Sequence, residues 1–141
     1  MSSGWELHNF TVLVLPNIEP KQVCCSVWRE METGETAYIA CVRDLFGETL
    51  YVFTHYSADV FSLCEVVIFG RPYVGQNLAV EGKAYRSFEH GWKNATELID
   101  GNALSCSSSD DAVYHHWWRV EFAKRVQVIA VHVASGKGKI I

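Results

Sequence analysis

Residues 117–122 read Trp-Trp-Arg-Val-Glu-Phe, and residues 126–133 read Val-Gln-Val-Ile-Ala-Val-His-Val. In the first stretch, apolar side chains alternate with Arg119 and Glu121, which is the period-2 pattern of a strand with one buried face. The second stretch is rich in β-branched residues, which favour strands. This part of the chain is therefore predicted to form β-strand.

Strand patterns also occur elsewhere, at residues 7–15, 50–53 and 63–69. Turn-like triplets separate such runs, among them Leu45–Gly47 and Asp100–Asn102. Only residues 92–99 are expected to form a turn or two of helix. Many short strands with turns between them predict an all-β sandwich.

Composition narrows the functional classes. With 49% hydrophobic and 20% charged residues in 141, the chain is expected to fold around one core as one domain. Its net charge of −4 argues against nucleic-acid binding, which needs a basic face. No apolar run reaches the roughly 18 residues of a membrane span. Asn9-Phe10-Thr11 and Asn94-Ala95-Thr96 fit the N-glycosylation pattern and favour secretion.

No catalytic set is recognisable in the sequence. Asp110 and Asp111 are adjacent in a Ser-rich segment, which favours solvated loop residues over a paired acid and base. The five cysteines allow two bridges with one thiol left over, and no Cys-x-x-Cys pattern indicates zinc. We therefore expect a secreted binding protein and not an enzyme.

Several motifs occur together in residues 77–133. They are Asn77–Ala84, the Leu-Ile-Asp-Gly-Asn turn at 98–102, Ser105-Cys106, the 117–122 strand and the valine-rich 126–133 strand. In this order they resemble the first half of an F-type (fucose-binding) lectin domain.

Residues 7–70 resemble the second half of the same domain. The matching elements are Cys25-Ser26-Val27, the Thr-Gly-Glu-Thr turn at 33–36, Cys41, and Leu-Cys-Glu-Val-Val-Ile at 63–68. The two halves thus stand in reversed order, joined by residues 71–76. The resemblance implies a circularly permuted, discoidin-like jelly-roll over residues 7–133, with 1–6 as linker and 134–141 as loop or tail.

Two arrangements fit the reversed order. In one, the chain closes its own sandwich, because the first and last strands of such a fold end near each other. In the other, halves pair between neighbouring chains as a swapped homo-oligomer. We favour the closed monomer.

The resemblance also implies the disulfides Cys25–Cys41 and Cys64–Cys106. The second bridge would join the two halves across the new joint. Cys24 is then the odd cysteine, and a small buried or half-buried thiol is the simplest interpretation. The alternatives are a reactive or intermolecular cysteine and a vicinal Cys24–Cys25 disulfide, which would compete with Cys25–Cys41.

The family binds calcium through oxygens of its Asp-Gly-Asn turn, of the serine before the bridged cysteine and of its closing strand. Carried over to this chain, the resemblance implies the ligands Cys64, Glu65, Glu97, Asp100, Asn102 and Ser105. A tight turn supplies the oxygens that Ca²⁺ prefers. The alternative is that Asp100–Asn102 is only a turn.

The sugar site implied by the family is less complete. Its histidine position falls on Ser108, and its two arginine positions fall at Gly136 and near Glu6. Substitute donors are His115, His116, Lys137 and Lys139, and the alternative is that these are loop and tail residues. Exposed rings could instead stack on sugar. The expected sugar-binding residues are Glu6, Tyr85, Trp92, Ser108, His115, His116, Lys137 and Lys139.

The resemblance implies an extracellular carbohydrate-binding module that recognises a fucose-type glycan on a cell-surface or egg-coat glycoprotein. Similar repeats occur in molluscan sperm bindins, which suggests a role in fertilization and an acrosomal location. The loss of the His/Arg set favours an alternative, an adhesion or assembly domain that binds no sugar. A discoidin-like lipid binder is a third interpretation, which the acidic charge does not help.

Overall fold

The computed structural model describes residues 8–15, 22–30, 35–54, 62–72, 74–88, 91–102, 105–108 and 116–135. Within these ranges the elements are strands and two short 3₁₀ turns. They are β1 (His8–Leu15), β2 (Gln22–Glu30), β3 (Thr36–Thr54), β4 (Ser62–Arg71), η1 (Leu78–Glu81), β5 (Lys83–Phe88), β6 (Gly91–Asn94), η2 (Thr96–Leu98), β7 (Ser107–Ser108) and β8 (Trp117–Ser135). The all-β prediction is therefore confirmed.

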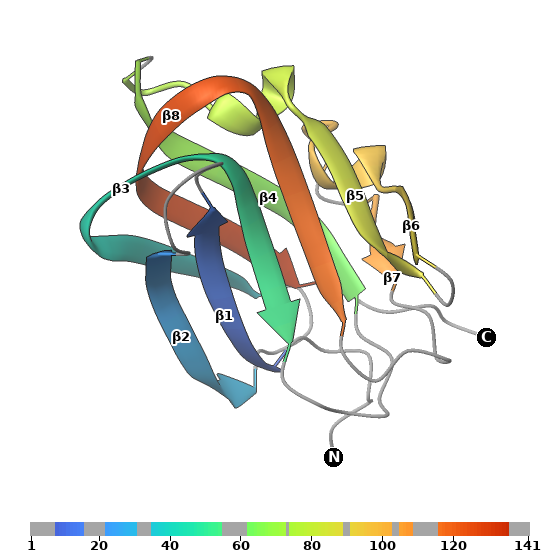
Figure 1. Ribbon diagram of the computed structural model, residues 1–141. Coiled ribbons are helices and arrows are strands. Elements are labelled where there is room, and N and C mark those ends of the chain that lie inside the picture. The colour runs from blue at the N-terminus through green and yellow to red at the C-terminus, as the bar shows by residue number, and fades with distance from the viewer. Residues whose placement is uncertain are drawn as a thin grey trace.

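The strands form one antiparallel network, in the order β2-β1-β3-β8-β4-β7, with the β5–β6 hairpin attached to β8. The network folds into two layers because β3 and β8 are long and bend (Figure 1). Residues 117–121 of β8 pair with β5 and with the end of β3. Residues 126–135 of β8 pair with the beginning of β3 and with β4. We call these the first and second layers.

The core lies between the two layers. Alternate residues of each strand face inward, as the period-2 pattern requires. The largest fully buried side chains include Phe10, Leu50, Leu63, Ile68, Leu98 and Trp118. The indole Nε1 of Trp118 donates a hydrogen bond of 3.2 Å to Oγ of Ser107, so its one polar group is satisfied inside the core.

Two local predictions were wrong. Leu45–Gly47 does not form a turn but lies inside β3, where the strand crosses between layers and its register with β8 shifts. Gly47 permits this crossing, because a Cβ there would lie 2.8 Å from the carbonyl oxygen of Leu15. Residues 92–99 are not mainly helical: residues 92–94 belong to β6, and only η2 makes a helical turn.

Strands from the two sequence halves interleave. β8, from the second half, lies between β3 and β4 of the first half. Gly70 near the end of β4 allows close contact with β8, since a Cβ there would overlap the carbonyl oxygen of Gln127. Both halves thus contribute to one hydrogen-bonded sheet within a single chain. Among the described residues, no helix has the length and apolar character of a membrane span.

Candidate cation corner and aromatic cluster

The predicted disulfide between Cys64 and Cys106 is present and connects β4 to the segment before β7. It draws together two stretches that are distant in sequence: Glu65 follows Cys64, and Ser105 precedes Cys106. η2 packs against β4 immediately before the Asp100–Asn102 turn. We call Glu65, Asp100–Asn102 and Ser105 the acidic corner.

The turn in the acidic corner has the local bonding expected of Asp-Gly-Asn. Oδ1 of Asp100 accepts a hydrogen bond of 2.9 Å from the backbone N–H of Asn102. Gly101 has φ +76°, a left-handed conformation that favours glycine. The N–H of Ser105 then donates to the carbonyl of Asn102 at 3.0 Å. The turn therefore presents several oxygen atoms within a short length of chain.

Glu65 is the unusual residue of the acidic corner. Its side chain is 8% exposed, and within the described residues neither carboxylate oxygen has a hydrogen-bond partner. Burial first, and then the negative charge of Asp100, together raise the pKa of Glu65 to about 7, against the opposing effect of the nearby backbone N–H of Gly101, whose geometry falls short of a hydrogen bond. In its ionised form, a buried carboxylate beside a second acid is costly unless a cation joins them.

The donor set of the acidic corner fits a hard cation. Among the described residues, no group of three or more His, Cys, Asp or Glu side chains is arranged to hold a metal. Ca²⁺ also takes backbone carbonyl, amide and hydroxyl oxygens. The negative charge would come from Glu65 and Asp100. Neutral oxygens would come from Asn102, Ser105 and the backbone carbonyl of Cys64. Glu97 lies in η2, three residues before Asp100.

The structure places two of the predicted sugar-binding residues inside the fold. The hydroxyl of Ser108 lies 2.8 Å from that of Ser62 in the β4–β7 pair. His116 is fully buried, and its backbone pairs with Thr54 of β3 through bonds of 2.8 to 3.1 Å. A buried imidazole cannot reach a glycan in solvent, so His116 is left out of the sugar surface. His116 precedes the buried Trp118 by two residues and so lies on the same strand face. That spacing could have predicted the burial of His116.

Four other predicted sugar-binding residues lie outside the described residues: Glu6, His115, Lys137 and Lys139. The same is true of the Cys24 and Cys25 side chains. Cys41 is disulfide-bonded. The pairing Cys25–Cys41 stays a prediction.

Tyr85 and Trp92 lie together on the outer face of the first layer. Their rings are 4.8 Å apart, edge to face. The guanidinium of Arg119 lies over both, at 4.8 Å from Tyr85 and 5.9 Å from Trp92, and at 5.1 Å from the ring of Trp117. We call Tyr85, Trp92, Trp117 and Arg119 the aromatic cluster. The sequence predicted an outward-facing Arg119 but not the rings of Tyr85 and Trp92 over it, because those come from β5 and β6.

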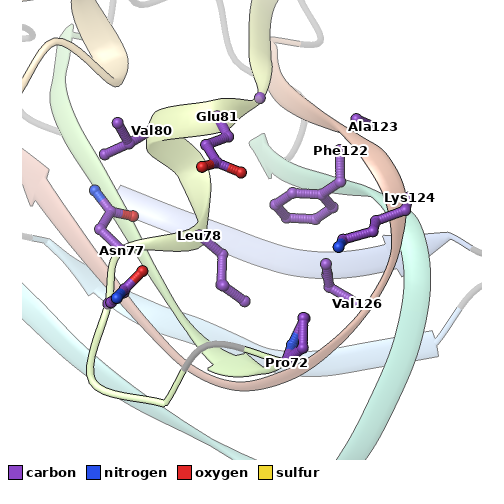
Figure 2. A pocket seen from close by; sticks show the side chains of 11 residues that line it. Pro72, Asn77, Leu78, Val80, Glu81, Phe122, Ala123, Lys124 and Val126 are labelled. Carbon is purple, nitrogen blue, oxygen red and sulfur yellow. The ribbon is translucent and has the colours of Figure 1, made fainter.

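A separate cavity of about 340 Å³ lies between η1 and the bend of β8. Leu78, Phe122 and Val126 form its apolar part, with Glu81 and Lys124 at its sides (Figure 2). No residue predicted to bind metal or sugar lines it. It is distinct from the acidic corner and from the aromatic cluster, which involve other residues.

Comparison of the chain with protein-family models, with curated proteins and with solved structures gives no significant match. Its function must therefore be argued from the sites themselves.

Proposed function

We propose that the chain is an extracellular carbohydrate-binding module whose fold is supported by Ca²⁺ at the acidic corner. One observation carries this proposal: Glu65, buried and without a hydrogen-bond partner among the described residues, lies beside the Asp100 turn and next to the Cys64–Cys106 bridge. The bridge joins two cysteines that are 42 positions apart in the sequence. Glu65 and Asp100 are also residues for which the F-type lectin resemblance implies a calcium site.

The disulfide supports an extracellular location, because such bridges persist in oxidising compartments. The interleaving of the two halves in one sheet supports a permuted jelly-roll of the F-type kind. The partner would be a glycan on a cell-surface or egg-coat glycoprotein, with fucosylated glycans as the first to test. Ca²⁺ would neutralise the two carboxylates and fix the turn.

Calcium binding can be measured directly by isothermal titration of chelator-treated protein with CaCl₂. We expect saturable binding of one equivalent, and a loss of at least tenfold in affinity for Glu65→Gln. Glu81→Gln is the matched control, because Glu81 is exposed and lies in η1. Equal affinities for the two variants would contradict the site.

The glycan function needs its own experiment. A glycan array probed in CaCl₂ and in EDTA should show binding to a defined group of oligosaccharides that weakens in EDTA. Absence of glycan binding in both conditions would contradict the lectin proposal.

A second candidate function is protein adhesion or assembly without sugar. The observation in its favour is the outer face of the second layer, where Tyr38, Phe46 and Ile129 are 75%, 40% and 40% exposed. Exposed apolar side chains of this size are typical of protein contacts when they gather on one face. Binding of an egg-coat or matrix protein that Tyr38→Ala abolishes, with no glycan binding, would favour this function.

A further inference from the structure

The aromatic cluster is assembled by strand register. Tyr85 of β5 and Tyr51 of β3 both stand directly opposite Arg119 of β8, one on each side. Trp92 of β6 stands opposite Ser87 of β5. Ser87 follows Tyr85 by two residues, so both lie on the same face of β5. Since alternate residues face opposite sides of a sheet, these side chains share the face that points away from core residues such as Val120.

The cluster combines a partly buried charge with an exposed ring. The side chain of Arg119 is only 18% exposed, yet Trp92 is 55% exposed beside it. Trp117 also contacts Tyr51, with ring centroids 5.7 Å apart, so the rings continue from β6 across to β3. An indole that remains this exposed beside a supported ring array provides a flat apolar surface.

An acid adjoins the rings. Nε of Arg119 lies 2.9 Å from Oε2 of Glu121, whose side chain is 41% exposed. Within the described residues that Nε has no hydrogen bond of proper geometry. That Nε is buried and out of reach of a ligand, so the donors that the guanidinium keeps for a third group are its terminal N–H groups. Glu121 keeps acceptor capacity for the same group.

We propose that this face binds the ring of a neutral hexopyranose, with Trp92 against the apolar C–H face of the sugar and the Arg119–Glu121 pair hydrogen-bonded to neighbouring hydroxyls. This inference rests on the proposed carbohydrate-binding function and gives it a location. Adjacent hydroxyls can accept from a guanidinium and donate to a carboxylate, which suits an acid–base pair whose charges balance. An anionic sugar would compete with Glu121 for Arg119, so neutral glycans fit better.

The location also accounts for the missing family donors. By the resemblance to F-type lectins, the family's histidine position falls on Ser108, and its two arginine positions fall at Gly136 and near Glu6. The aromatic cluster supplies an arginine, an acid and stacking rings from other elements.

The test uses the whole chain in CaCl₂ and an array of neutral, sialylated and sulfated oligosaccharides. The best neutral oligosaccharide is then titrated by calorimetry against wild type and variants. We expect Trp92→Ala to weaken binding at least tenfold and Glu121→Gln to weaken it severalfold. Tyr38→Ala is the matched control, because Tyr38 is an exposed ring on the other layer that also makes an edge contact, with His132 at 4.6 Å. It should leave the affinity unchanged.

The outcomes separate the two proposals. If wild type binds a glycan and Trp92→Ala and Glu121→Gln bind it equally well, this face is not the site, although the lectin proposal stands. Loss of binding in Phe122→Ala alone would move the site to the cavity at η1 and overturn the inference. Preference for sialylated or sulfated glycans would overturn the neutral-sugar assignment. If wild type binds no glycan, both proposals fail.

Discussion

The acidic corner and the aromatic cluster both hold charged side chains against the same two-layer core, yet they are built in opposite ways. In the corner, Glu65 is buried beside Asp100 and has no hydrogen bond among the described residues. In the cluster, Arg119 is surrounded by three rings and paired with Glu121. The corner thus lacks a positive charge, whereas the cluster already has its counter-charge.

This difference bears on what each site does for the protein. A buried, ionised Glu65 beside the exposed Asp100 destabilises the fold until a cation neutralises the pair, so ligand binding there should change stability. An ion pair whose charges balance, and whose acid is 41% exposed, contributes little to stability, so a ligand there should change affinity and leave the fold alone. Mutations at the two sites should therefore separate stability from binding.

The largest expected effect is at the disulfide that holds the corner together. Replacing both Cys64 and Cys106 by Ser should lower the free energy of unfolding by about 4 kcal/mol, because the bridge closes a loop of 42 residues. Urea unfolding followed by tryptophan fluorescence measures this loss. A loss below about 1 kcal/mol would show that strand pairing alone holds the corner.

Calcium should stabilise the wild type through the same corner. At a free concentration one hundred times the Kd, the expected gain is about 2.7 kcal/mol, because only the folded chain gathers the ligands. Glu65→Gln should lose most of this gain in urea titrations with CaCl₂ against EDTA, while Glu81→Gln keeps it. An equal gain in both variants would place the cation elsewhere.

In EDTA, the corner should make stability depend on pH. Burial and Asp100 raise the pKa of Glu65 from 4.5 to about 7, so between these values the folded chain holds a proton that the unfolded chain has released. Stability should therefore fall as pH rises from about 4.5 to about 7, and level off above. We expect a loss of about 2 kcal/mol, less than the full shift implies because water screens part of the burial.

The control for this pH dependence is Glu65→Gln, which cannot ionise. Its urea midpoint should decline less than that of wild type between pH 5 and about 7.5, and it should be the more stable protein at the upper end. Parallel profiles for the two proteins would show that another group carries the pH dependence.

The strands were predictable because alternation is a local property. Residues 63–69 and 117–122 carry the pattern within a few positions, and both are strand in the structure. The bend in β3 was not predictable from the sequence. A strand that crosses between layers at Gly47 has the same local composition as a turn.

The candidate sites divide in the same way. The turn at Asp100–Asn102 and the Cys64–Cys106 bridge followed from motifs and resemblance. The burial of Glu65, with no hydrogen-bond partner among the described residues, did not follow from the motifs. It depends on how β4 packs against the segment that leads into the turn. The rings around Arg119 also escaped prediction, since Tyr85 and Trp92 reach it through register between strands distant in sequence.

The smallest expected effect on stability is at Trp92. Trp92→Ala should lower the free energy of unfolding by about 0.5 to 1 kcal/mol, because the ring is 55% exposed and the contacts it makes with Tyr85 and Arg119 lie at the surface. Trp118→Ala is the contrasting variant: its ring is 1% exposed, and the loss there should be about 3 to 5 kcal/mol. Urea unfolding measures both. A loss at Trp92 that approached the loss at Trp118 would mean that the cluster holds the β5–β6 hairpin to the sheet, and its exposed ring would then be a structural contact and not a surface kept open for sugar.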